Sequence, residues 1–363
     1  MRLPAHTVLL TTLALVGCSH RPAAGQPVER GPRLYATYCA TCHGAERNGY
    51  KSDNAPSLAT ATFLASASDD FLRQAIARGR PGTAMAAYGH ALGGPLVAAD
   101  VDALVGFLRA GAPPRIALPL GPIAGDVGSG KAIYATACVR CHGTPVQRST
   151  AVHLANPILL QTASDAFLRY AVTEGRLPTA MVAWKNQLSP KQIDDVVAYV
   201  RSLAVAPGVP ARPAANLPGP PALPRQGPIV INARGRAPDF TLKEGLYVSI
   251  DQVKAALDAK RRLIIADART PAEWLNLHVQ GAISAPYYDL KGLGDIPNDG
   301  TWVVAYCACP HHVSGMVVEE LRKRGYPHTA VLDEGIFAWQ QKKYPVVMAP
   351  GMLPPPAPPP TGR

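Results

Sequence analysis

Two copies of one short motif constrain this chain more than any other feature. In each copy two residues separate a pair of cysteines, and a histidine directly follows the second cysteine. The copies are Cys39, Cys42 and His43, and Cys138, Cys141 and His142. This is the spacing of a covalent haem attachment site, because the thiols reach the two vinyl groups of one porphyrin while the imidazole meets the iron. A redox dithiol and half of a zinc site share the cysteine spacing and stay as alternatives. We therefore expect two covalently attached c-type haems.

The motifs lie in two copies of one unit, at about residues 29–111 and 127–205. Both copies have a glycine eight residues before the first cysteine, a tyrosine four residues before it, a shared Ala-Ser-Asp segment and a closing helical pattern. These are Gly31, Tyr35, 67–73 and 101–108 in the first copy, and Gly130, Tyr134, 163–169 and 193–203 in the second. Ser189 with Gln192 predicts a capping box at the second closing helix, and Asp100 is the candidate cap of the first. The sequence predicts a tandem pair of small helical domains.

The repeated unit resembles the class I cytochrome c fold, a small all-α domain wrapped around one haem. In that family the second axial ligand of the iron is a methionine in a loop before the last helix. Met85 and Met181 hold this position in the two copies. The resemblance implies that each methionine binds haem iron opposite the motif histidine of its own copy. His90 and His153 are the competing ligands, and we expect both to be surface imidazoles. Because a six-coordinate iron has no open position, the haems are expected to carry electrons.

The N-terminal segment has the composition of an export signal. Arg2 precedes the apolar run 8–16, which is too short to span a bilayer and ends in the sequence Leu-Val-Gly-Cys at Cys18. This ending resembles the lipobox of bacterial lipoproteins, which implies a signal peptide at 1–17, an acylated Cys18 and a tether at 18–28. A plain signal peptide with an unpaired cysteine is the alternative. We expect an exported protein on the periplasmic face, attached by lipid to a membrane, the outer one in particular, without spanning it.

The charge of the chain does not point to nucleic acid. The formal net charge is +11, but the basic residues are scattered along the sequence and form no single cluster. An exported protein meets no genome, and two haems would add four carboxylates. We therefore expect no nucleic-acid partner, and a positive field that favours an anionic substrate or an acidic redox partner.

A different domain follows the helical repeats. Proline-rich segments at 206–235 and 349–363 predict a semi-rigid linker and a disordered tail, since proline removes backbone donors and fixes φ. Between them, at 236–348, short apolar runs alternate with helical patterns, as in an α/β domain with a buried parallel sheet. The predicted strands are 263–266, 302–306 and 329–332, and the predicted helices are 250–257 and 317–324. The expected fold is thus multidomain, with two all-α domains followed by one α/β domain.

The C-terminal domain resembles the rhodanese family. The resemblance is carried by Asp267-Ala268-Arg269, Glu273-Trp274, His278 to Ala282, Val331 to Gly335, Trp339 and Tyr344 to Val346. In that family the catalytic cysteine directly follows the central strand, which is the position of Cys307. A thiolate at the end of a strand and the start of a helix is stabilised by converging backbone N–H groups. The resemblance implies that Cys307 takes a sulfane sulfur and holds it as a persulfide; buried packing is the alternative.

The loop after Cys307 departs from the family pattern. Active rhodanese loops carry an arginine about five residues after the cysteine, whereas this loop continues with Cys309, His311 and His312. The two histidines are candidates to replace the arginine, and Cys309 is a candidate to resolve a persulfide or to form a disulfide with Cys307. A zinc or copper site is a further alternative. A third haem is excluded, because a single residue separates the two cysteines.

Together these patterns predict a periplasmic dihaem electron carrier that is coupled to sulfur or thiol redox chemistry, or to sulfur transfer, at the Cys307 loop. The expected partners are a sulfane-sulfur or thiol donor and a redox protein, which is a soluble cytochrome, a terminal oxidase or a dehydrogenase. The alternative is a pure electron carrier whose rhodanese-like domain is a non-catalytic docking or sulfur-binding module.

Overall fold

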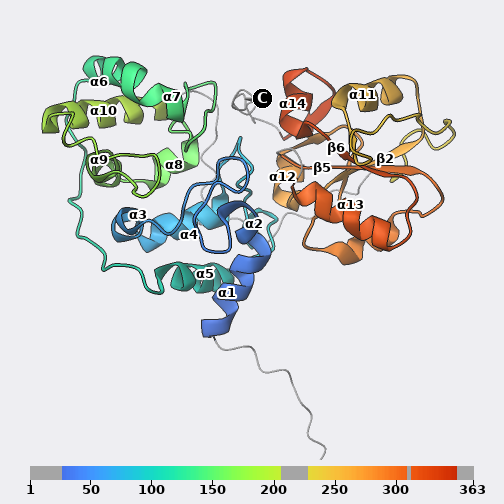
Figure 1. Ribbon diagram of the computed structural model, residues 1–363, viewed down its shortest axis with the longest axis horizontal. Coiled ribbons are helices and arrows are strands. Elements are labelled where there is room, and N and C mark those ends of the chain that lie inside the picture. The colour runs from blue at the N-terminus through green and yellow to red at the C-terminus, as the bar shows by residue number, and fades with distance from the viewer. Residues whose placement is uncertain (1–26, 206–227, 309–311, 350–363) are drawn as a thin grey trace, which may run out of the picture.

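The protein folds into three packed domains in a computed structural model that describes residues 27–205, 228–308 and 312–349. Figure 1 shows two helical domains, blue to teal and green, and an α/β domain in gold to red that lies beside the first of them. We call them the first helical domain, the second helical domain and the C-terminal domain. The predicted fold class, two all-α domains followed by an α/β domain with a parallel sheet, is confirmed.

The first helical domain is built from five α-helices. They are α1 (Pro27–Tyr38), α2 (Ala40–His43), α3 (Ala61–Ser66), α4 (Asp69–Arg78) and α5 (Ala98–Arg109), with a short 3₁₀ helix at His90–Leu92. Helices α1 and α5 cross at Gly31, where an added Cβ would lie 2.5 Å from the backbone oxygen of Ala103. The N-cap of α5 differs from the sequence prediction. Asp100 lies inside the first turn and accepts a hydrogen bond from the N–H of Val97, which is the N-cap residue.

The second helical domain repeats this arrangement. Its helices are α6 (Val127–Ile133), α7 (Val139–His142), α8 (Pro157–Thr162), α9 (Asp165–Glu174) and α10 (Pro190–Ser202), with a π turn at Tyr134–Cys138 and a 3₁₀ turn at Leu203–Val205. The predicted capping box of Ser189 and Gln192 is present at the start of α10. Helices α6 and α10 cross at Gly130, whose added Cβ would lie 1.9 Å from the backbone oxygen of Asp195. A glycine is required there because two helix backbones meet.

The repeated Ala-Ser-Asp segment caps one helix and fastens it to the closing helix. Ser68 and Ser164 each accept the backbone N–H three residues later, so they are the N-caps of α4 and α9. The aspartate that follows each serine forms an ion pair with an arginine near the end of the closing helix. The pairs are Asp69 with Arg109 and Asp165 with Arg201. Phe71 and Phe167, one from each copy, pack with ring centroids 4.8 Å apart and so join the two apolar cores.

The C-terminal domain is a five-stranded parallel sheet between helices. The strand order is β1-β6-β5-β2-β4, and β3 and β7 form a separate antiparallel ribbon. The strands are β1 (Tyr247–Val248), β2 (Leu263–Asp267), β3 (Leu277–Val279), β4 (Ile283–Ser284), β5 (Trp302–Tyr306), β6 (Thr329–Leu332) and β7 (Val346–Met348). The helices are α11 (Ile250–Asp258), α12 (Pro271–Asn276), α13 (Val313–Lys323) and α14 (Gly335–Gln341), with a 3₁₀ helix at Leu290–Asp295. Helices α11 and α14 cover one face of the sheet and α13 the other (Figure 1).

The polar residues that follow the central strands lie together at the carboxyl end of the sheet. Strands β2 and β5 are neighbours in register, with Asp267 opposite Tyr306, so both strands end at the same level. Cys307 therefore emerges beside Asp267, at the carboxyl end of the sheet where ligands bind in open α/β folds. The helix predicted at 317–324 begins earlier, at Val313, which brings its first turn against this edge.

The three domains meet around Arg148. This side chain of the second helical domain forms a buried ion pair with Asp53 of the first, at 2.9 Å, and lies over the ring of Phe337 of the C-terminal domain. In the described ranges no helix is both long and apolar enough to cross a bilayer. Cys18 and the expected signal peptide lie outside the described residues, as do most of the proline-rich linker, the loop residues 309–311 and nearly all of the tail.

Candidate functional site

Each cysteine motif forms a single helical turn that presents its histidine to the domain interior. The Nδ1 of His43 donates to the carbonyl of Pro56 at 2.8 Å, and the Nδ1 of His142 donates to the carbonyl of Val152 at 2.7 Å. Each hydrogen bond holds the ring in the tautomer whose Nε2 can bind a metal. Burial lowers the pKa of both imidazoles, which also favours the neutral, metal-binding form. No disulfide joins the four motif cysteines in the described part of the chain.

The tyrosine four residues before each motif ties the motif to its own domain. The hydroxyl of Tyr35 donates to the carbonyl of Gly44 at 2.8 Å, and that of Tyr134 donates to Gly143 at 2.9 Å. Both glycines directly follow a motif histidine and have a positive φ. The two tyrosines are buried, so the repeated spacing seen in the sequence fixes where the chain turns away after the histidine.

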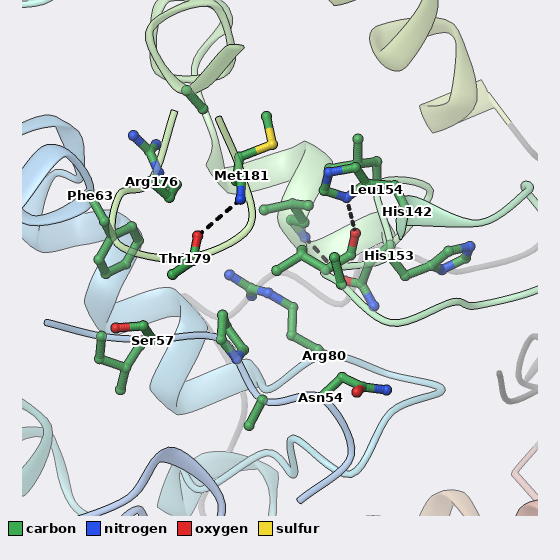
Figure 2. A pocket seen from close by; sticks show the side chains of 18 of the residues that line it. Asn54, Ser57, Phe63, Arg80, His142, His153, Leu154, Arg176, Thr179 and Met181 are labelled. Carbon is green, nitrogen blue, oxygen red and sulfur yellow. Dashed lines mark hydrogen bonds between the residues drawn. The ribbon is translucent and has the colours of Figure 1, made fainter. Parts of the chain in front are cut away.

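The two methionine loops are folded alike. Met85 and Met181 each accept, through the backbone oxygen, the N–H of an arginine five residues earlier, at 2.8 and 2.7 Å. Each methionine N–H in turn is held by the hydroxyl of a threonine two residues before it. Both methionines line the same cavity as the motif histidines. The structure thus places the predicted ligands of each copy around one space, and Figure 2 shows Met181 and His142 at its border.

Neither competing histidine is placed as a better ligand. His90 is exposed and does not line the cavity. His153 was expected at the surface, but it is buried with 6% of its area exposed and lines the cavity. Its Nε2 donates to the carbonyl of Thr144 at 2.8 Å, so this histidine supports the loop after the second motif.

One cavity of about 770 Å³ serves both copies. All six motif residues and both methionines lie on its wall, together with apolar side chains of both helical domains. The two attachment sites therefore do not lie in separate clefts. They open into one space at the interface of the two helical domains.

Three arginines line this cavity and were not foreseen from the sequence: Arg148 is buried, and Arg80 and Arg176 are partly buried. Burial lowers the pKa of Arg80 and of Arg176 to about 10, and each guanidinium lies over a phenylalanine ring. Within the described residues Arg176 Nη2, Arg148 Nε and Thr60 Oγ1 are buried and have no hydrogen-bond partner. A buried cation needs an anion. Figure 2 shows the side chains of Arg80 and Arg176 at this pocket. The repeat contained the signal, since Arg80 and Arg176 each follow a glycine at equivalent positions.

These unpaired groups fit a haem. The porphyrin is a large apolar disc with two carboxylates, and the cavity offers an apolar wall, buried donors and cations, and paired thiols beside an imidazole. The donor set of histidine nitrogen and methionine sulfur suits haem iron and leaves no open coordination position. Elsewhere in the described chain, no group of three or more His, Cys, Asp or Glu residues is arranged to hold a metal ion.

The second candidate site surrounds Cys307 at the end of β5. The cysteine is buried, with 2% of its area exposed, and its Sγ lies 3.2 Å from the hydroxyl of Ser314 in the first turn of α13. Cys309 and His311 lie outside the described residues, so their predicted roles remain predictions. His312 precedes α13 and lines the same small cavity as Cys307. Its Nε2 donates to the backbone oxygen of Thr41, in the first cysteine motif, at 2.7 Å.

A buried charge network lies beneath the cysteine. Arg269 forms two hydrogen bonds to Asp267, at 2.9 and 2.6 Å, and Asp267 also accepts the hydroxyl of Tyr306 at 2.7 Å. The carboxylate of Glu273 lies 3.6 Å from Arg269 Nη1. Burial raises the pKa of Glu273 to about 7, and Cys307 contributes to the rise although Arg269 opposes it. The charged side chains of the Asp-Ala-Arg and Glu-Trp segments therefore form one network, which extends to Cys307.

A small cavity of about 30 Å³ joins this site to the first helical domain. Its wall combines Cys307, Glu273 and Tyr287 of the C-terminal domain with residues of the first, among them Tyr88 and Cys42. The hydroxyls of Tyr88 and Tyr287 lie 3.3 Å apart across the boundary. Sequence reasoning found Cys307 and His312 but missed Glu273, Tyr88 and Tyr287 as parts of this site.

Comparisons with known proteins agree with this division of the chain. The family model of the cbb3-type cytochrome c oxidase subunit III matches residues 26–108 and again 125–200, and the rhodanese-like domain model matches 249–342. The chain therefore contains two tandem cytochrome c-like domains and a C-terminal rhodanese-like domain. The helical part of the chain belongs to the cytochrome c family, in which covalently bound c-type haem carries electrons.

Three relatives illustrate the parts. The cbb3-type cytochrome c oxidase subunit CcoP of Rubrivivax gelatinosus is 32% identical over 52% of this chain and 58% of its own length. Cytochrome c6 of Limnospira maxima is 33% identical over 21% of this chain and 91% of its own length. The probable adenylyltransferase/sulfurtransferase MoeZ of Mycobacterium tuberculosis is 30% identical over 28% of this chain and 26% of its own length. The chain spans 58% to 61% of the length of the oxidase subunits it matches.

Proposed function

We propose that the protein carries electrons through two c-type haems and couples them to sulfur or thiol redox chemistry, or to sulfur transfer, at Cys307. One observation carries the proposal: the haem cavity and the cysteine pocket share a wall. Tyr38, Cys42, Ala84 and Tyr88 line both. A sulfur site and a haem attachment site that share single side chains are close enough to exchange electrons without a mobile carrier.

The residues of the haem cavity have distinct tasks. The four motif cysteines would hold two porphyrins, His43 with Met85 and His142 with Met181 would bind the irons, and Arg80 and Arg176 would face carboxylates. When bound, such a haem supplies reversible one-electron transfer, at a potential that the sulfur ligand raises. The protein would contribute a largely apolar wall and one space that holds both sites.

At the other site the protein prepares a cysteine for sulfur chemistry. The hydroxyl of Ser314 can donate to a thiolate at Cys307, and α13 begins at Val313 in the wall of the same cavity, where a helix N-terminus stabilises negative charge. Glu273 can hold a proton near the sulfur, and Arg269 keeps that carboxyl in place from the opposite side. Electrostatics also indicate that Cys42 lies near Cys307. Burial, then the charge of Asp53 and then that of Cys307 raise the pKa of the Cys42 thiol to about 12.

The setting of the protein belongs to the same proposal. An acylated Cys18 would attach the chain to a membrane on the periplasmic side, the outer membrane in particular. The redox partner would be a soluble cytochrome, a terminal oxidase or a dehydrogenase. Similarity to proteins described as cbb3-type oxidase subunits supports the oxidase among these.

The test is an anaerobic assay on the purified ferric holoprotein with a panel of sulfur donors, both inorganic and organic. We expect at least one donor to leave one sulfur atom on Cys307, detected by peptide mass, and to reduce the haems, detected by absorbance. Cys307→Ser should lose both signals. Cys309→Ser removes the second thiol of the same loop and should still load sulfur on Cys307, because the role expected for Cys309 is to resolve the persulfide and not to form it. If no donor transfers sulfur to Cys307 or from it to cyanide, the sulfur half of the proposal is wrong.

The alternative is a pure electron carrier whose rhodanese-like domain docks or binds sulfur without catalysis. Cys307 is buried, and the loop sequence after it contains no arginine. Both observations favour this alternative. It predicts that Cys307→Ser leaves the reduction of the haems by every donor unchanged. The same assay therefore separates the two functions.

A further inference from the structure

The methionine loop of the first helical domain, residues 79–86, is held by a carboxylate from a distant segment. Asp53 accepts the backbone N–H of Ala84 at 2.7 Å, directly before Met85. A charged acceptor makes a stronger hydrogen bond than a neutral one. Asp53 has a φ of +44°, a conformation that aspartate and asparagine adopt more readily than other residues with side chains. The position of this carboxylate therefore helps to fix where the chain enters Met85.

The second helical domain supplies the partner of this carboxylate. Arg148 Nη1 lies 3.1 and 2.9 Å from the two carboxylate oxygens of Asp53. The two side chains are only 6% and 10% exposed, and the guanidinium carbon lies 5.6 Å from the ring centroid of Phe337 in the C-terminal domain. Loss of one member of such a pair leaves the other charge buried and unpaired, which is strongly unfavourable. The ion pair therefore joins the first methionine loop to the segment that follows the second cysteine motif.

A second residue of the same domain holds the loop directly. Asn156 Nδ2 donates to the backbone oxygen of Pro81 at 3.0 Å. The Oδ1 of this buried asparagine accepts two backbone N–H groups in the first turn of α8, so its own helix fixes how the amide is oriented. The second helical domain thus holds the loop at two points, directly at Pro81 and through Asp53 at Ala84.

The methionine loop of the second copy is held in a different way. Thr62 of the first domain donates to the backbone oxygen of Gly175 at 2.8 Å, at the start of that loop. Ser149 occupies the place of Asp53, three residues before the carbonyl that accepts the motif histidine. Its hydroxyl donates to the backbone oxygen of Arg140 at 2.7 Å. Serine carries no charge, so the ion pair of the first copy has no counterpart at this position.

We propose that Arg148, acting through Asp53, is a positioning residue for Met85, so that the second helical domain holds the methionine of the first at its ligand position. The inference rests on the haem part of the proposed function and goes beyond it, since it makes one copy a condition for ligand binding in the other. Without Arg148 the buried carboxylate is drawn toward water, and the N–H of Ala84 loses its acceptor. The loop then opens more often, and the methionine sulfur is displaced more easily.

The first measurement is backbone hydrogen exchange of the full-length ferric holoprotein, in peptides from 79–86 and from 175–182. Arg148→Met should speed exchange in 79–86 by about tenfold, which corresponds to about 1.4 kcal/mol, and should leave 175–182 within about twofold. Arg78→Met is the matched control, since Arg78 Nη2 also crosses to the second helical domain and donates to Gln161 at 2.8 Å, at the surface. It should leave exchange in both peptides unchanged.

The second measurement follows the sulfur of Met85. In a Met181→Ala background, the long-wavelength absorbance band of sulfur-ligated ferric haem reports on the first site alone. Imidazole, which competes with the sulfur for ferric iron, is added until half of the band is lost. Arg148→Met should lower this imidazole concentration by about tenfold relative to the same background. Arg78→Met should leave it unchanged.

A double variant separates a lost positioning contact from a damaged fold. Asparagine at position 53 keeps the size and the tolerated φ of aspartate, and its amide oxygen can still accept the N–H of Ala84, but it has no charge that needs Arg148. Adding Asp53→Asn to Arg148→Met should therefore bring both measurements back to within about threefold of their reference values. A double variant that is as loose as Arg148→Met overturns the inference, because the defect then does not act through Asp53.

The remaining outcomes distinguish the inference from the proposed function. If Arg148→Met changes neither the exchange of 79–86 nor the imidazole concentration, the inference is wrong and the haem function stands. Equal acceleration of both peptides also overturns it, because that result shows a general loosening of the domain interface. Faster exchange in 79–86 with an unchanged imidazole concentration has the same meaning, since the methionine is then held by other contacts. If the Met181→Ala protein has no such band, Met85 is not a ligand, and both the ligand assignment and the inference are wrong.

Discussion

Replacing Glu273 by glutamine tests the buried network under Cys307 most directly. The pKa of this carboxyl is raised from 4.5 to about 7, chiefly by burial. A carboxyl with a raised pKa in the folded state favours folding below its ordinary pKa, and the contribution is lost as the pH rises through the folded value. For Glu273 that window runs from about pH 4.5 to about pH 7. At about 1.36 kcal/mol for each pKa unit, the whole loss is about 3 kcal/mol.

Glutamine keeps the shape of the side chain and stays neutral at every pH. The free energy of unfolding of Glu273→Gln should therefore be close to that of the wild type at about pH 5 and exceed it at about pH 8, by at most about 3 kcal/mol. The measurement is urea unfolding of the holoprotein at the two pH values, followed by tryptophan fluorescence, since Trp274, Trp302 and Trp339 lie in the C-terminal domain.

The matched control is Glu319→Gln. Glu319 is exposed, and its hydrogen bond with Lys323 lowers the pKa of the carboxylate, so its contribution to stability has the opposite sign. If the two substitutions change stability equally at both pH values, the burial argument for Glu273 is wrong. Strong destabilisation of Glu273→Gln at about pH 8 would also contradict the burial argument, because it would show that the Glu273 carboxylate is ionised and well paired with Arg269.

Two further predictions concern the helical domains. Gly130→Ala should lower the thermal unfolding temperature more than Gly31→Ala, because the added Cβ would lie 1.9 Å from a backbone oxygen at position 130 and 2.5 Å from one at position 31. Overpacking of this kind costs about 1–3 kcal/mol. If the unfolding temperature of both variants is unchanged, the helix crossings are wrong. Met85→Ala and Met181→Ala should each remove the long-wavelength absorbance band of sulfur-ligated ferric haem at one site and lower that haem's potential. If both variants keep the full band, the assignment of the axial ligands is wrong.

The candidate haem-binding residues could be proposed from the sequence because the motif depends on local spacing. Two cysteines, two intervening residues and a histidine occupy one helical turn, so the primary structure already contains the geometry. The repeat then adds independent support for the methionines. The same comparison of copies would have revealed Arg80 and Arg176, since each follows a glycine and precedes a methionine by five residues.

Other features could not be foreseen because they depend on packing between distant segments. Tyr88 and Tyr287 are separated by 199 positions and meet only when the domains dock. Glu273 is recognisable as part of a family signature, but its raised pKa arises from the burial that docking completes. His153 shows the reverse error, because it was expected to be a surface imidazole, but it is buried and donates to the carbonyl of Thr144 after the second motif.

The two copies are alike in sequence, but their neighbours in the fold differ, so the two motifs are not equivalent. The first motif lies against the C-terminal domain, where Thr41 receives His312 and Cys42 borders the cavity of Cys307. Within the described residues the second motif has no contact of this kind with the C-terminal domain, and Cys141 is exposed. Because both motifs line one cavity, the proposed electron path from Cys42 to the second site runs within that cavity. We therefore expect Cys307 to exchange electrons with the first site and a separate redox protein to exchange electrons with the second. The two copies of the unit would then serve an internal and an external redox partner.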